Sequence, residues 1–168
     1  MPPSPCSLRS RCRVLRFAPL TAAQVEAVLH AEVPQADAAT RSAAVAAAEG
    51  SPGAALDFVA QDLGKLHGLM QRLIAEGDAH FALRGSFADE LGTRPDRQRQ
   101  QAAVDLARAV VARQLGQSGA NRDQRVIAAH GALVRLGAQL PTYNFDPGLV
   151  AMEIGALLAS LAVSTEAA

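Results

Sequence analysis

Alanine accounts for 36 of the 168 residues, and this excess constrains the possible folds more than any other feature of the chain. Alanine costs the least free energy of all residues in a helix. Aromatic residues, which favour strands, make up only 4% of the chain, and tryptophan is absent. Hydrophobic residues still make up 49%, so the chain can bury a core as one domain or two small ones. The composition therefore predicts an all-α fold of closely packed helices.

Three helices are predicted in the first part of the chain, residues 19–64. Thr21 and Gln24 match a capping box, in which the threonine hydroxyl accepts from the third helical N–H and the glutamine side chain accepts from the N-cap N–H. This signal predicts a first helix over 22–31. The residues expected on its buried face are Val25, Val28 and Leu29. An alanine-rich second helix is predicted over 37–49.

A turn at Gly50 separates the second helix from a third. Ser51 can cap the third helix, and Pro52 fits its first position because the N–H that proline lacks would have no partner there. The residues expected on its buried side are Leu56, Val59 and Leu63. Residues 19–64 are therefore predicted to form a compact three-helix unit.

Five further helices are predicted in residues 65–163, followed by a short tail over 164–168. Apolar residues recur in this part of the chain at helical spacing. The first of these helices starts near Leu66 and stops at Gly77, and the others cover 79–91, 95–116, 122–138 and 147–163. We expect separate cores for the two units, with few contacts across Asp62–Leu66 apart from helix packing. The last helix is apolar on more than one side, so it either contacts a partner or forms the centre of the core.

The charges of the whole chain cancel, with 16 basic and 16 acidic residues. This balance argues against a domain whose entire surface binds nucleic acid. The distribution is uneven, because residues 1–16 carry four arginines and no acid, and residues 17–64 carry one base and six acids. Arg9, Arg11 and Arg13 would lie on one face of an extended chain. Such a face fits either a phosphate contact or a solvated basic edge.

No metal site and no membrane segment are predicted. The four histidines are far apart in the sequence, and Cys6 and Cys12 lack the second pair that a zinc site needs. The N-terminus lacks the apolar core of a secretory signal, and no apolar run is long enough to cross a bilayer. We therefore expect a cytoplasmic protein that does not contact a membrane.

One short strand is predicted outside the helices. Residues 1–8 contain three prolines, so we expect them to be irregular. Cys12–Phe17 mixes apolar and basic residues and ends before Pro19, which is typical of a strand. A single strand has no partner in a helical chain. Residues 1–18 are therefore interpreted as the remnant of another domain.

Two motifs resemble those of a known family. The run Leu8-Arg9-Ser10-Arg11-Cys12-Arg13 is followed by Pro19-Leu20 and a capped helix. It resembles the Ser-Arg-Cys motif that closes the ATPase domain of AAA+ clamp-loader subunits of bacterial DNA polymerase III. The run Glu49-Gly50-Ser51-Pro52-Gly53-Ala54-Ala55-Leu56 resembles their turn into the last helix of the lid. The resemblance implies a three-helix lid over 19–64, a helical collar over 65–163, and an ATPase domain that this sequence lacks.

Gly53 decides which kind of subunit the resemblance implies. In the ATP-hydrolysing subunits, the lid turn carries at this place an arginine that senses bound nucleotide. The chain therefore resembles the accessory subunits of the δ′ type, which do not hydrolyse ATP. By this resemblance, Arg11 is a trans-acting arginine finger that reaches ATP on a neighbouring subunit. The motif and turn residues implied in the same way are Ser10, Cys12, Gly50, Ser51 and Gly53.

The implied function is to help load the sliding clamp onto primed DNA in replication, within a holoenzyme whose DNA-directed DNA polymerase is a nucleotidyltransferase. The implied partners are the other clamp-loader subunits, with the sliding clamp and primed DNA reached through the complex. No catalysis and no cofactor are expected of the chain itself, because neighbouring subunits bind the ATP. Two alternatives stay open. One is an ATP-hydrolysing clamp-loader subunit, which Gly53 disfavours, and the other is a free-standing helical binding or adaptor module with Arg9–Arg16 as a surface arm.

Overall fold

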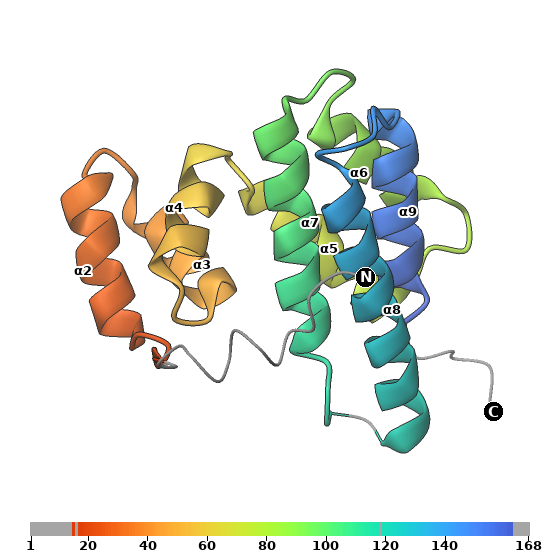
Figure 1. The fold of residues 1–168 in the computed structure, drawn as a ribbon, viewed down its shortest axis with the longest axis horizontal. Helices are drawn as coiled ribbons and strands as arrows, with labels where there is room; N and C mark the ends of the chain where they lie inside the picture. The colour runs from red at the N-terminus through yellow and green to blue at the C-terminus, as the bar shows by residue number, and fades with distance from the viewer. Residues whose placement is uncertain (1–14, 16, 118, 163–168) are drawn as a thin grey trace, which may run out of the picture.

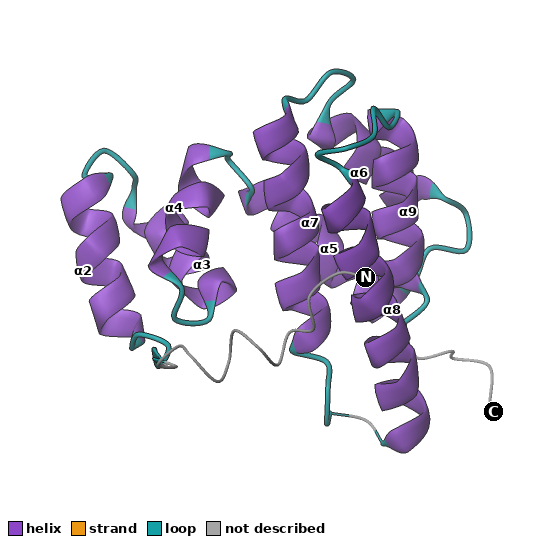
Figure 2. Cartoon of the chain, viewed as in Figure 1, coloured by secondary structure: helices purple, strands orange, loops and turns teal. Residues whose placement is uncertain are grey.

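Helices are the only regular structure in the described part of the chain. A computed structural model describes residues 15, 17–117 and 119–162, and these residues contain eight helices and no strand (Figure 2). The predicted all-α class is confirmed. The predicted strand, Cys12–Phe17, lies outside the described residues except for Leu15 and Phe17, which are exposed and belong to no strand. None of the described helices is both long and apolar enough to span a membrane.

Three helices form the first unit, as predicted. They are α2 (Ala22–Glu32), α3 (Ala38–Ala48) and α4 (Pro52–Ala60). The predicted capping box is present: the Thr21 hydroxyl accepts from the Gln24 N–H at 3.3 Å, and the Gln24 side chain accepts from the Thr21 N–H at 2.9 Å. The side chains of Asp37 and Ser51 cap α3 and α4 in the same way. Local caps therefore determine where each of these helices begins.

Five helices form the second unit. They are α5 (Gly64–Glu76), α6 (Ala82–Leu91), α7 (Arg97–Ala112), α8 (Ala120–Gln139) and α9 (Pro147–Ala159). All five were predicted, with differences at their ends. The helix α6 begins later than expected because Phe81 adopts a left-handed conformation, with φ +60°. The helix α9 ends early because the Ser160 hydroxyl donates to the Leu157 carbonyl at 2.7 Å, which replaces the next helical bond.

The buried side of α4 differs from the predicted one. The structure buries Ala55 and Phe58, whereas Leu56 and Val59 are only half-buried. Leu63 is buried, but it lies beyond α4, at the N-cap of α5. The reason is that α4 packs against both α3 and α7. Burying the ring of Phe58 in that contact removes more apolar surface from water than burying either aliphatic residue.

The two units share one hydrophobic core. Figure 1 shows α2, α3 and α4 on one side of the molecule and α5 to α9 on the other. Both α3 and α4 pack against α7, and the buried apolar side chains of the two units form one connected cluster. The expectation of separate cores is therefore wrong, because α3 and α4 pack against α7 and α3 also packs against α5. The division into a lid and a collar stays a prediction.

The helix α9 is the central helix of the second unit. It packs against α5, α6, α7 and α8. Ile154 and Leu158 are completely buried, and Leu157 is half-buried. Only the start of the helix presents a large apolar side chain to solvent, that of Leu149, which is 70% exposed. The apolar character of α9 on several sides is therefore explained mainly by its own neighbours within the chain.

A buried ion pair lies at the start of α6, next to α9. The Asp78 side chain is 3% exposed and accepts from the N–H groups of Leu83 and Arg84 at 3.0 Å and from Arg84 Nε at 2.9 Å. The stem of Arg84 lies against Gly155, where an added Cβ would come within 2.6 Å of Arg84 Cγ. Burial alone raises the pKa of Asp78, but the hydrogen bonds from Arg84 and Leu83 and the charge of Arg84 outweigh it and lower the pKa.

We predict that Asp78→Asn destabilises the fold and makes it less sensitive to acid. Asparagine cannot accept all three hydrogen bonds and leaves the charge of Arg84 unpaired, so we expect a loss of about 2 kcal/mol in the free energy of unfolding at neutral pH. Because the folded pKa of Asp78 is lowered, its contribution is present above about pH 4 and is lost as the pH falls through the folded value. Denaturant unfolding at a series of acidic pH values measures both effects.

Glu76→Gln is the matched control for this prediction. Glu76 pairs with Arg72 on α5, and both side chains are more than half exposed. Solvent screens such a pair, so the control should change the free energy of unfolding much less than Asp78→Asn. Equal losses in the two variants would contradict the role given to the buried pair.

Candidate functional site

The predicted Ser-Arg-Cys motif lies outside the described residues. This holds for Ser10, Arg11 and Cys12, for which a role at a neighbouring nucleotide was predicted. The other predicted residues are all described, and they lie between α3 and α4 and in the first turn of α4. We refer to this segment, Gly50–Gly53, as the α3–α4 turn. The candidate site that the structure describes begins there.

Gly50 holds the segment that leads into α2. Its φ is +82°, a left-handed conformation that favours glycine. The Leu20 N–H donates to the Gly50 carbonyl at 2.9 Å. A Cβ on Gly50 would lie 2.5 Å from the Leu20 carbonyl oxygen and 2.7 Å from Pro19 Cβ. Glycine at this position therefore lets Pro19 and Leu20 pack against the α3–α4 turn. This contact joins two parts of the chain that are far apart in the sequence.

Ser51 and Gly53 have different roles in the same turn. The Ser51 hydroxyl accepts from the Ala54 N–H at 3.3 Å, so it caps α4 as predicted. Gly53 is exposed, and no other group lies within 4 Å of the position that its Cβ would occupy. Packing therefore does not require glycine at position 53. The space there would accept a long side chain, including the arginine expected in ATP-hydrolysing clamp-loader subunits.

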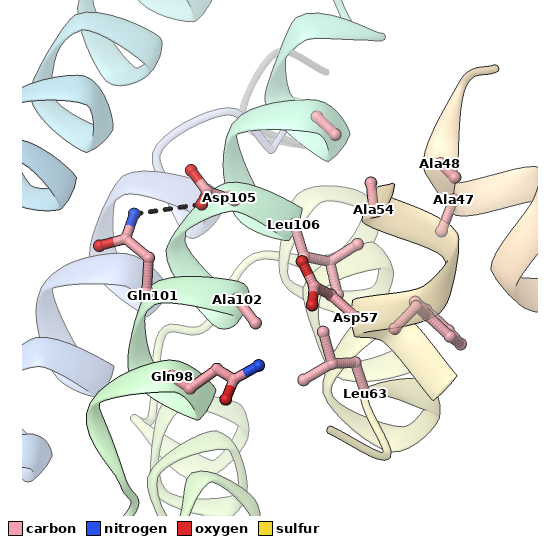
Figure 3. Close-up of a pocket in the computed structure, with 12 residues that line it drawn as sticks. Ala47, Ala48, Ala54, Asp57, Leu63, Gln98, Gln101, Ala102, Asp105 and Leu106 are labelled. Carbon is pink, nitrogen blue, oxygen red and sulfur yellow. Dashed lines mark hydrogen bonds between the residues drawn. The ribbon is translucent and has the colours of Figure 1, made fainter. Parts of the chain in front are cut away.

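A cleft lies between the two units, beside the α3–α4 turn. It is a cavity of about 350 Å³ lined by the end of α3, by α4, by Leu63 and by one face of α7 (Figure 3). The larger apolar side chains in its wall are Phe58, Leu63 and Leu106, and alanines make up most of the rest. The polar groups are Asp57 from α4 and Gln98, Gln101 and Asp105 from α7. The cleft is therefore apolar inside with acidic and amide groups at its edge.

The polar edge of the cleft suits binding better than catalysis. The Asp105 carboxylate accepts from Gln101 Nε2 at 3.1 Å and from Arg108 Nη1 at 2.8 Å. The Asp57 side chain is exposed and makes no hydrogen bond or ion pair with another described residue. Carboxylates and amides over an apolar floor can hold a cationic or amide group.

Two arginines from α7 and its C-cap bridge the units. The Arg99 guanidinium donates to the carbonyl of Gln61 in the first unit and to that of Glu90, at 3.1 Å, in the second. Arg113 Nε lies 2.5 Å from Glu49 Oε1 at the end of α3. Neither bridge was predicted from the sequence. The partners are distant in the sequence, and no local pattern indicates which of the fifteen arginines turns inward.

His67 is buried, and its ring contacts the Phe58 ring edge-on with centroids 5.8 Å apart. Burial, and then the charge of Arg113, lower the pKa of His67. Across residues 15, 17–117 and 119–162, no group of three His, Cys, Asp or Glu side chains could hold a metal ion.

No protein-family model, curated protein or solved structure matches this chain. The two sequence motifs and the geometry of the α3–α4 turn are therefore the basis on which a function is proposed.

We predict that Gly50→Ala destabilises the fold by about 2 kcal/mol or more, because alanine is strained at positive φ and its Cβ would clash with Leu20. Gly53→Ala is the matched control in the same turn. Its methyl group meets no neighbour and lowers the entropy of the unfolded chain, so the free energy of unfolding should rise by up to about 1 kcal/mol. Denaturant unfolding of both variants measures the difference. A similar effect of the two substitutions would contradict the contact between Gly50 and Leu20.

Proposed function

We propose that the chain acts as an accessory clamp-loader subunit of the δ′ type, which helps load the sliding clamp of DNA polymerase III onto primed DNA. The observation that supports this proposal is the hydrogen bond between the Leu20 N–H and the Gly50 carbonyl. It joins the ends of the two segments that resemble the family, residues 8–20 and 49–56. The described end of the first segment, Leu20, is thus held at the turn that resembles the lid turn of the family.

Arg11 is the residue proposed to act on ATP. Negative charge develops on the phosphoryl group as it is transferred, and a guanidinium supplied by a neighbouring subunit stabilises that charge. Lysine could not replace Arg11, because it lacks the planar fork of donors that matches phosphate. Gly53 has no side chain with which to sense a nucleotide, although the space for one exists. The proposed subunit therefore assists hydrolysis on a neighbour and needs no cofactor of its own.

The proposed partners are the other clamp-loader subunits, with the clamp and primed DNA reached through the complex. The second unit has an exposed surface suited to such contacts. Ile127 and Val134 lie two turns apart on α8 and are 63% and 40% exposed. Large apolar side chains that stay in solvent on one helix face favour burial against another protein. We propose that this face of α8 contacts a sister subunit in the cytoplasm.

A free-standing helical adaptor is the second candidate, and the cleft between the units favours it. The apolar cleft with Asp57 and Asp105 at its edge could hold a basic segment of a partner without any clamp loader. In that case residues 1–18 would be dispensable for partner binding, whereas a δ′-type subunit needs them for its effect on ATP hydrolysis.

We predict that the chain binds an ATP-hydrolysing clamp-loader subunit and that Ile127→Asp weakens this binding by about tenfold or more, because a charge would be buried in the contact. Leu115→Asp is the matched control. Leu115 is also more than half exposed, but it lies after α7 and off the face of α8. Sedimentation of mixed subunits measures the complex. No complex with any clamp-loader subunit would refute the proposal, and equal weakening by both variants would refute the assigned face.

We also predict that Arg11→Ala depresses the ATP hydrolysis that clamp and DNA stimulate in a loader assembled with a protein carrying this sequence. Assembly should stay intact, because the guanidinium acts mainly on the transition state. Arg9→Ala and Arg13→Ala should have smaller effects, because only one guanidinium can occupy the position at the phosphate. Steady-state hydrolysis assays compare the three variants. Equal small losses in all three would mean that the arginines form only a basic edge.

A further inference from the structure

The second unit contains a pocket that the proposed function does not use. It is a cavity of about 360 Å³ lined by residues of α5, of the end of α7 and its C-cap, and of the first turn of α8. Its polar lining consists of His67, Gln71, Arg113, Gln114 and Arg122. Ile74, Ala75 and Val110 form its apolar wall. We refer to this cavity as the α5–α7–α8 pocket.

All ionisable groups in the lining of this pocket are basic. They are the guanidinium groups of Arg113 and Arg122 and the imidazole of His67, and no carboxylate lines the cavity. Two acids lie close by. Glu49 reaches Arg113 Nε from α3 at 2.5 Å, and Asp123 Oδ1 accepts from the Gly116 N–H at 2.8 Å, in the loop between α7 and α8. The lining itself therefore contains only basic ionisable groups, while Glu49 and Asp123 lie outside it and offset charge of the two arginines.

Three of the last four carbonyls of α7 already accept hydrogen bonds. The carbonyls of Ala109 and Val111 accept from the Arg113 N–H, and the carbonyl of Ala112 accepts from the Leu115 N–H. The carbonyl of Arg113 itself accepts from Gln117 Nε2. The negative end of the helix is thus satisfied without the guanidinium of Arg113. Stabilisation of the helix end alone does not explain why this guanidinium lines the cavity.

Donors remain available in the pocket. Arg113 Nε donates to the Glu49 carboxylate, and the two terminal nitrogens of Arg113 make no hydrogen bond with another described residue. Gln71 Nε2 lies 3.3 Å from His67 Nε2, which allows the amide to donate to a neutral ring. The pocket therefore combines a guanidinium with free N–H groups, a second guanidinium and an imidazole on an apolar wall. A group that accepts several hydrogen bonds and carries negative charge matches this surface.

We propose that the α5–α7–α8 pocket binds a phosphate group, supplied by a nucleotide or by the backbone of a nucleic acid. The planar guanidinium of Arg113 donates to two phosphate oxygens, and Arg122 contributes positive charge from the other wall. His67 lies beside the bound group, so the negative charge favours its protonated form. The apolar side chains of Ile74 and Val110 in the wall can contact the apolar face of a sugar or base. This inference does not depend on the clamp-loader function.

The test is an NMR titration of the His67 ring in the full chain with inorganic phosphate, at constant ionic strength and with chloride as the reference anion. We expect saturable shifts of the His67 signals with phosphate and a raised pKa of His67 in the bound state, because the anion offsets burial and the charge of Arg113. Arg113→Gln should weaken binding by about tenfold. Arg135→Gln, an exposed residue of α8 outside the pocket, is the control and should change nothing.

Arg113→Gln also leaves Glu49 unpaired, so a second variant tests the proposal in case Arg113→Gln does not fold. Gln71→Glu places a carboxylate on the exposed rim of α5 and should abolish phosphate binding by repulsion while leaving the fold intact. Titrations with ATP and with a single-stranded oligodeoxynucleotide then distinguish the source of the phosphate by their relative affinities. The proposal is overturned if phosphate moves the His67 signals no more than chloride does. It is also overturned if Arg135→Gln weakens binding as much as Arg113→Gln.

Discussion

The packing of small side chains where α3 meets α7 is the contact on which the rest of the arrangement depends. Ala47 and Ala48 on α3 and Ala102 on α7 are buried at this junction. A methyl group lets two helix backbones approach closely, and it leaves room for the single large ring of Phe58. The two units therefore share a core instead of sitting on a flexible linker. Larger residues at these positions would extend into the cleft, which these alanines line.

Two arginines fix the orientation of the two units, which pack against each other through small side chains. Arg99 donates across the junction to the Gln61 carbonyl, and Arg113 pairs with Glu49. Each bridge is only partly buried, so neither could replace the apolar contact as the source of stability. They fix how one unit is oriented on the other. The width of the cleft beside Asp57 follows from that orientation, because its two walls belong to different units.

The two proposed sites lie on either side of the bridge between Arg113 and Glu49. On one side, the α3–α4 turn follows Glu49 directly and holds Leu20 at Gly50. On the other side, Arg113 lines the α5–α7–α8 pocket beside His67. A bound anion would compete with Glu49 for the guanidinium of Arg113, since both are negative. The junction thus connects the α3–α4 turn, which holds Leu20, with a pocket proposed to bind phosphate.

The sequence by itself determined the helical class and the starts of most helices, because these depend on neighbouring residues. Thr21, Asp37 and Ser51 cap their helices wherever those helices pack, and alanine favours a helix in any surroundings. The sequence also predicted the α3–α4 turn. The tertiary structure decided which side of α4 is buried, that α9 is surrounded by its own chain, and that the two units share a core. Only the tertiary structure places Arg113 next to Glu49 and His67. Packing depends on residues from distant segments, and a local pattern contains no information about which of them will meet.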